Sequence, residues 1–137
     1  MALIMIVDDD AQIQLALRQI VESAGHRVIE ASNGQDAIDL FEEFFPDLVI
    51  TDLFMPHMDG IEMIRLIRRM TTAARIIAIS GGGGGGWNYL ESVVVLGADL
   101  ALQKPFTYSK LLSAIDCLLG GPMPVDSDRR ESVAAAC

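Results

Sequence analysis

Short apolar runs of strand length alternate with amphipathic helical patterns five times along this chain of 137 residues. The runs predict strands over residues 2–7, 27–31, 47–51, 75–80 and 98–103. Because these runs are almost continuously apolar, each strand is expected to be buried on both sides, as in a parallel sheet covered by helices. The repeat predicts an α/β fold of the flavodoxin-like type, a doubly wound (βα)5 sandwich whose five-stranded parallel sheet has the order 2-1-3-4-5.

Local signals mark the ends of several helices. Gly25 follows the first helical pattern as a stop, and Asn33 and Thr107 stand where the second and fifth helices would be capped. A third helix is expected to begin near Gly60 and a fourth to span residues 88–96. After residue 119, glycine and proline interrupt the apolar pattern. The sequence thus predicts one domain over residues 1–119 and a poorly ordered tail over residues 120–137.

The charge balance excludes some classes of partner. The chain is 51% hydrophobic, enough for a small core, and carries a formal net charge of −9 with its basic residues scattered. Neutralising a nucleic-acid backbone needs clustered Lys and Arg, so no nucleic acid is expected as a partner. No apolar stretch approaches the roughly 20 residues of a membrane span, and the apolar run at the N-terminus is too short for a signal peptide. We expect a soluble, cytoplasmic protein that does not bind a membrane.

Polar side chains stand at the carboxyl ends of predicted strands. Asp8 and Asp9 follow the first strand, Asp52 follows the third, Ser80 ends the fourth and Lys104 follows the fifth. In a parallel sheet these ends meet at one edge, and in the order 2-1-3-4-5 the first and third strands are neighbours. We therefore expect the three carboxylates to lie together, with the hydroxyl and the ammonium group nearby.

Carboxylates that lie this close together indicate a cation site, because their mutual repulsion would otherwise raise the pKa of one of them. Mg²⁺ fits such oxygen donors, and Mn²⁺ is a possible substitute. Asp9 and Asp52 are predicted as direct ligands, Asp8 as a ligand through water, and Phe54 as the donor of a backbone carbonyl oxygen.

The remaining polar groups suit a phosphoryl group bound at the same edge. Phosphoryl transfer depends on neutralising charge and on in-line positioning more than on covalent assistance. Lys104 would supply a positive charge for phosphate oxygens, while the Ser80 hydroxyl and the neighbouring amide of Gly81 would donate hydrogen bonds. These groups together predict a metal-assisted acceptor of a phosphoryl group at Asp52.

A set of short motifs carries a resemblance to one family. The motifs are Val7-Asp8-Asp9, Thr51-Asp52 with Met55-Pro56 and Met58-Asp59-Gly60, Ile79-Ser80-Gly81, and Leu96-Gly97-Ala98 leading to Lys104-Pro105-Phe106. In this order and spacing they resemble the receiver domain of response regulators in two-component signalling. The resemblance covers about residues 2–119.

The resemblance implies that Asp52 accepts a phosphoryl group from a histidine kinase or a histidine phosphotransfer protein. It implies that Asp8 and Asp9 form the acidic metal pair, that Ser80 is the switch hydroxyl and that Lys104 senses the phosphate. The protein would then catalyse only its own phosphorylation and dephosphorylation, so it is not expected to be an enzyme. It would signal by contact with a downstream protein, as a phosphorelay shuttle, an adaptor or a phosphate sink.

Two departures from the family pattern bear on how such a domain switches. Ala101 stands three positions before Lys104, where the family usually has an aromatic residue that swings inward. Residues 81–86 are six consecutive glycines, which lose much conformational freedom on ordering. We therefore predict that closure of this glycine loop over Asp52 replaces the aromatic switch, draws in Trp87 and repositions the start of the fourth helix.

Two other functions remain open from the residues alone. In a haloacid-dehalogenase-like phosphatase, Asp8 would be the nucleophile and Asp10 the acid and base. That alternative lacks a late acidic pair, since only Asp116 follows Lys104 within the helical repeat. A receiver fold that acts as an interaction module without phosphorylation would be compatible with Ala101, although the complete acid, hydroxyl and lysine set argues against it.

Overall fold

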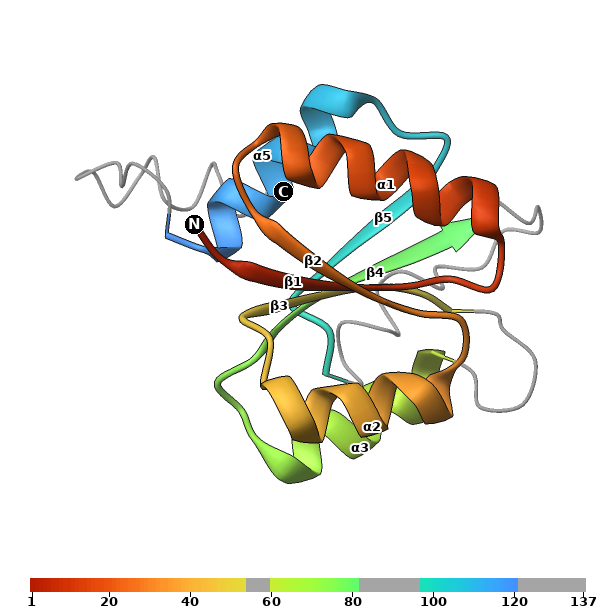
Figure 1. The fold of residues 1–137 in the computed structure, drawn as a ribbon, viewed down its shortest axis with the longest axis vertical. Helices are drawn as coiled ribbons and strands as arrows, with labels where there is room; N and C mark the ends of the chain where they lie inside the picture. The colour runs from red at the N-terminus through yellow and green to blue at the C-terminus, as the bar shows by residue number, and fades with distance from the viewer. Residues whose placement is uncertain (54–59, 82–96, 121–137) are drawn as a thin grey trace.

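Five parallel strands form the centre of the protein, with helices on both faces of the sheet (Figure 1). The computed structural model describes residues 1–53, 60–81 and 97–120. The strands are β1 (Leu3–Val7), β2 (Arg27–Ala31), β3 (Leu48–Asp52), β4 (Arg75–Gly81) and β5 (Leu100–Lys104). They are arranged in the order β2-β1-β3-β4-β5, and each neighbouring pair is parallel. The predicted fold class and strand order are confirmed.

Each strand lies within two residues of its predicted bounds, and the differences concern the functional edge. β3 continues to Asp52, which pairs in register with Ile79 of β4. β5 continues to Lys104, which pairs with Gly81. These predicted site residues therefore belong to the ends of regular strands rather than to the loops that follow.

Among the described residues, two helices cover each face of the sheet. Helices α1 (Ala11–Ser23) and α5 (Tyr108–Leu118) lie on one face, and α2 (Gly34–Phe44) and α3 (Gly60–Met70) lie on the other (Figure 1). The predicted caps are confirmed, because the Asn33 side chain accepts from the Asp36 amide at 2.8 Å and that of Thr107 accepts from the Lys110 amide at 3.1 Å. The fourth helix predicted over residues 88–96 lies outside the described residues, as does the tail from residue 121 onward.

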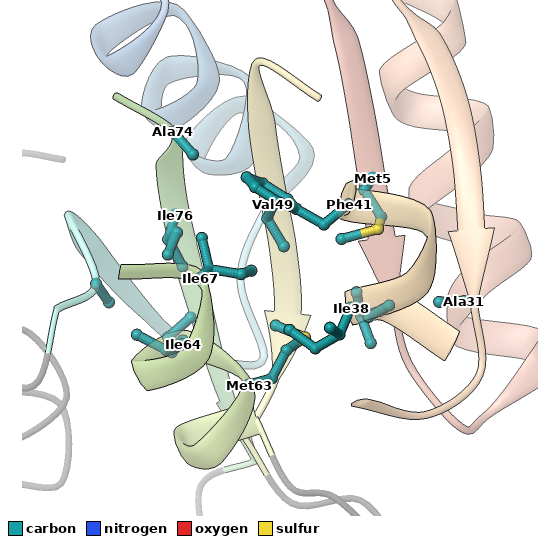
Figure 2. Packing of buried hydrophobic residues seen from close by; sticks show 14 of the residues in the cluster. Met5, Ala31, Ile38, Phe41, Val49, Met63, Ile64, Ile67, Ala74 and Ile76 are labelled. Carbon is teal, nitrogen blue, oxygen red and sulfur yellow. The ribbon is translucent and has the colours of Figure 1, made fainter. Parts of the chain in front are cut away.

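The apolar core is divided by the sheet into two clusters. On one face, Figure 2 shows Phe41 of α2 and Ile67 of α3 packing with Val49 and Ile76 of the sheet. On the other face, side chains of α1 and α5 pack with alternate residues of the same strands, such as Ile50. The central strands β1, β3 and β4 are thus buried on both sides, as their continuous apolar sequence predicts, whereas the outer strands β2 and β5 are only partly buried.

Buried polar side chains gather at one edge of this sheet. Among the described residues they are Asp8, Thr51 and Ser80, and each lies at or just after the carboxyl end of a strand. Burying a polar group is unfavourable unless another group satisfies it. The energetically unfavourable burial of polar side chains is therefore located at the carboxyl ends of the strands, where the sequence predicts the functional site.

Candidate functional site

Three carboxylates converge at the carboxyl ends of β1 and β3. These strands are neighbours, with Val7 and Thr51 paired in register, so Asp8 and Asp9 come beside Asp52. One oxygen from each carboxylate lies within 4.8 Å of the others. The structure therefore brings together the three predicted side-chain ligands of the metal site.

Asp8 is the most buried member of this cluster, with an exposed fraction of 1%. Its Oδ1 accepts a hydrogen bond from the Asp10 amide at 2.8 Å, whereas its buried Oδ2 accepts none from the described part of the chain. Burial raises the pKa of Asp8; the Asp10 hydrogen bond acts in the opposite direction, and the charge of Asp52 raises the pKa further. A buried acceptor without a donor, beside two further carboxylates, is an environment that a divalent cation would stabilise.

Asp10 has a structural task that its neighbours do not share. Its side chain caps α1 by accepting from the amides of Gln12, at 2.9 Å, and Ile13, at 3.5 Å. The first amides of a helix have no partner within the helix, and a carboxylate at this position satisfies them. Asp10, the third acid of the triplet, therefore serves as the N-cap of α1.

The backbone around Asp52 is held from three directions. The Thr51 hydroxyl donates to the Asp52 carbonyl oxygen at 2.8 Å, and the Leu53 amide donates to the Ile79 carbonyl oxygen of β4 at 3.1 Å. Gly60, the first residue of α3, donates to the Leu53 carbonyl oxygen at 3.0 Å. A Cβ atom at Gly60 would lie 2.2 Å from the Asp52 carbonyl oxygen, so only glycine allows this approach.

Lys104 and Ser80 complete the edge on the side of β5. Lys104 Nζ lies 3.9 Å from Asp8 Oδ2, which brings the ammonium group of the last strand to the acids of the first. Ser80, 8% exposed, follows Ile79, the residue that pairs with Asp52. The predicted carbonyl donor Phe54 lies outside the described residues, as do residues 82–86 of the glycine run and Trp87.

Sequence reasoning missed the two residues that hold the Asp52 backbone. In the sequence, Thr51 and Gly60 stand out only as parts of motifs, and nothing in the residue pattern shows that both contact one peptide unit. A hydroxyl residue within an apolar strand was the available signal for Thr51, because a buried hydroxyl requires a partner.

The model of the response regulator receiver domain matches residues 4–116. The chain belongs to the response regulator receiver family. The chemotaxis protein CheY of Thermotoga maritima is 34% identical over 114 residues, a match that covers 82% of this chain and 93% of that protein. CheY of Bacillus subtilis is 36% identical over 114 residues with the same coverage.

Solved structures show the same receiver fold. A receiver domain protein from Clostridium thermocellum has a TM-score of 0.81 and 29% identity, over 88% of this chain and 95% of that one. A putative response regulator from Chloroflexus aurantiacus also has a TM-score of 0.81, with 26% identity over 87% of this chain and 98% of that one. The family is also represented by longer relatives, since the response regulator MprA of Mycolicibacterium vanbaalenii is matched over 52% of its length.

Family membership decides against the haloacid-dehalogenase-like phosphatase, whereas a receiver fold that acts without phosphorylation would belong to the same family. A receiver domain is a module of two-component signalling rather than an enzyme with a separate substrate, and the receiver family implies a histidine kinase as the phosphodonor. The acidic cluster of Asp8, Asp9 and Asp52 is consistent with its phosphorylation site and is typical of a Mg²⁺ pocket. None of the described helices is both long and apolar enough to span a membrane.

Proposed function

We propose that Asp52 is the phosphoacceptor of this CheY-like response regulator and that Asp8 and Asp9 complete its metal site. The observation that carries the proposal is the convergence of the three carboxylates within 4.8 Å, with the buried Oδ2 of Asp8 accepting no hydrogen bond from the described residues. Clustered acids of this kind repel one another in the absence of a cation. A bound cation would relieve this repulsion and would allow a negatively charged phosphoryl group to bind beside the carboxylates.

The reaction is a transfer between two nucleophiles. A carboxylate oxygen of Asp52 attacks the phosphorus of a phosphohistidine donor, forming a P–O bond while the P–N bond breaks on the opposite side. The imidazole nitrogen of the donor leaves with the electron pair of that bond and takes a proton from solvent. The product is an acyl phosphate at Asp52, and the donor is a histidine kinase or a histidine phosphotransfer protein.

Asp8, Asp9 and Asp52 are the side chains that would hold the cation, with Phe54 as a proposed carbonyl donor. Bound Mg²⁺, or Mn²⁺ in its place, would offset the negative charge of the phosphoryl oxygens. The charge of Asp52 contributes to the raised pKa of Asp8, and this coupling supports one shared site for the acids.

Lys104, Ser80 and the amide of Gly81 would bind the phosphoryl group once it is on Asp52. Lys104 lies 3.9 Å from Asp8 Oδ2, beyond the distance of a direct hydrogen bond, so its ammonium group retains donors for a phosphate oxygen. The Ser80 hydroxyl is an additional donor. A phosphate that draws the Lys104 ammonium group and the Ser80 hydroxyl toward Asp52 would change the conformation at the carboxyl ends of β4 and β5. This change would alter the surface that a downstream protein contacts.

The proposal extends to the organisation of the chain and its place in the cell. Residues 1–119 form the receiver domain, and residues 120–137 form a tail that is not needed for phosphorylation. The cytoplasmic location expected from the sequence belongs to the same proposal, as does signalling through a protein target whose affinity depends on the acyl phosphate.

Phosphorylation with acetyl phosphate and Mg²⁺, followed by intact-mass spectrometry, tests the acceptor. We expect a single phosphoryl adduct on the wild-type protein and none on Asp52→Asn. Asp10→Asn is the matched control, since asparagine also caps helices well and the variant should be phosphorylated at the wild-type rate. Phosphorylation of Asp52→Asn at the wild-type rate would refute the assignment.

A further inference from the structure

Thr51 is a polar residue in an apolar layer of the core. Its side chain is fully buried, and its partners in register are Val7 of β1 and Ala78 of β4, both members of the cluster beneath α2 and α3. A valine would occupy nearly the same space and would bring no hydroxyl that needs a partner. The contribution of threonine at this position must therefore come from the bond that its hydroxyl makes.

That bond is to the backbone of Asp52. Thr51 Oγ1 donates to the Asp52 carbonyl oxygen at 2.8 Å. The amide at the other end of the same peptide unit, on Leu53, donates to the Ile79 carbonyl oxygen at 3.1 Å. Both polar atoms of the peptide unit that follows the Asp52 Cα atom are thus hydrogen-bonded, one within β3 and the other to β4.

The start of α3 closes the third side of this peptide unit. A Cβ atom at Gly60 would lie 2.2 Å from the Asp52 carbonyl oxygen and 2.9 Å from the Leu53 Cα atom. The Gly60 amide also donates to the Leu53 carbonyl oxygen at 3.0 Å. The peptide unit therefore cannot tilt toward α3, and the Thr51 hydroxyl fixes the rotation that the contact with Gly60 leaves open.

We propose that Thr51 is a positioning residue for the phosphoacceptor, an inference that rests on the proposed role of Asp52. The hydroxyl fixes the orientation of the peptide plane next to the Asp52 Cα atom, and this orientation sets the direction in which the carboxylate leaves the strand. In-line attack on phosphorus depends on that direction, because displacements of about 1 Å in reacting groups can reduce rates by up to roughly 100-fold. Thr51 acts through Asp52 and does not itself contact the phosphoryl group.

Thr51→Val removes the hydroxyl and keeps the shape of the side chain. We expect its rate of phosphorylation by acetyl phosphate at saturating Mg²⁺ to fall about 3- to 10-fold, the range that the loss of one hydrogen bond corresponds to. Thr51→Ser keeps the hydroxyl and should stay within about 2-fold of the wild-type rate. Thr51→Ala has nearly the volume of Thr51→Ser without the hydroxyl, so this pair isolates the hydrogen bond even if the valine variant packs poorly.

A second measurement separates positioning from a general effect on stability. Amide hydrogen exchange of Leu53 and Gly60 in the metal-free protein should become at least several-fold faster in Thr51→Val and should be restored in Thr51→Ser. Ile67→Val is the matched control, since it removes a methyl group from the same buried layer but leaves the Asp52 peptide unit untouched. It should lower stability without changing either the phosphorylation rate or the exchange of these two amides.

The outcomes distinguish this inference from the function on which it rests. If the wild-type protein takes no phosphoryl group at Asp52, the proposed function fails. If it does and Thr51→Val reacts at the wild-type rate, or if Ile67→Val slows the reaction equally, Thr51 has no positioning role. The assignment is supported if Thr51→Val is phosphorylated more slowly than the wild type while Thr51→Ser and Ile67→Val are phosphorylated at close to the wild-type rate.

Discussion

Asp8 carries an electrostatic cost in the metal-free protein. Its carboxylate is almost completely buried, and burial together with the charge of Asp52 raises its pKa. Replacing this buried carboxylate by a neutral side chain removes the cost of burying its charge beside Asp52, so the replacement should stabilise the metal-free fold.

We therefore expect Asp8→Asn to increase the free energy of unfolding of the metal-free protein by about 1 kcal/mol near neutral pH. Asparagine Oδ1 can still accept from the Asp10 amide, so the hydrogen bond within the loop is retained. Urea unfolding in EDTA measures the change, and Asp9→Asn, at an exposed position, is the control with the smaller expected effect. A clear loss of stability in Asp8→Asn would show that the buried charge is compensated.

The same comparison has a pH dependence whose sign follows from the raised pKa of Asp8. The folded state binds this proton more tightly than the unfolded chain does, since the pKa lies above the ordinary value of 3.8. The Asp8 contribution to stability is therefore fully present below pH 3.8 and is lost as pH rises through the folded pKa. The advantage of Asp8→Asn over the wild type should accordingly grow with rising pH and then level off, which unfolding curves at several pH values would measure.

At the scale of single residues, the sequence predicts the charged residues of the site better than it predicts the residues that hold the backbone of Asp52. Asp8, Asp9 and Asp52 were predictable as a cluster because each stands at the carboxyl end of an apolar strand and the strand order makes those two strands neighbours. The relation between Thr51 and Gly60 was not predictable in this way. It depends on a 2.8 Å bond and on a close approach by a helix that begins after an intervening loop.

At the scale of secondary-structure elements, Arg68 connects α3 to the residues that precede β4 and β5, at the amino ends of these strands. Its guanidinium donates to the carbonyl oxygens of Gly97 and Ala74 and pairs with Asp99 Oδ2 at 2.7 Å. The same Asp99 oxygen accepts from the Ile76 amide at 2.7 Å. One side chain thus links a helix to two strands at their amino ends, which are opposite the acidic cluster.

We expect Arg68→Met to lower the free energy of unfolding by about 2 kcal/mol, because the carbonyl oxygens of Gly97 and Ala74 lose this donor and Asp99 loses its ion pair. The adjacent Arg69→Met is a matched control. Arg69 is exposed and makes no hydrogen bond or ion pair with the described residues, so its replacement should change stability by no more than about 0.5 kcal/mol. Equal urea midpoints for the two variants would show that the Arg68 contacts contribute nothing measurable.

The elements themselves were largely predictable because each carries its own signal. Apolar runs gave the five strands, and Asn33 and Thr107 cap the helices for which they were predicted. The ends of β3 and β5 were less accurate, since backbone pairing with β4 extends these strands over polar residues that would otherwise indicate a loop. Register with a neighbouring strand is a property of the sheet, and the residues of one strand do not reveal it.

At the scale of the whole molecule, cation binding and folding should be linked through the acidic cluster. A ligand that binds only the folded state stabilises it, by about 2.7 kcal/mol at a concentration of 100 times the Kd. We expect Mg²⁺ to raise the unfolding midpoint of the wild-type protein and EDTA to reverse the change. Asp9→Asn and Asp52→Asn should each show a much smaller rise. A rise of equal size in the Asp52→Asn variant would place the cation elsewhere.

The division of the core by the sheet has a consequence for how such a domain can diversify. Met5, Val49 and Ile76 pack beneath α2 and α3, while Ile4 and Ile50 pack beneath α1 and α5. Side chains of α2 and α3 lie in one cluster and those of α1 and α5 in the other, and sites that are well separated and share no partners affect stability additively. Substitutions in the helices of one face should therefore have effects on stability that are independent of substitutions in the helices of the other face. A lineage can remodel one pair of helices for a new target while the opposite layer and the chemistry at the strand ends remain as inherited.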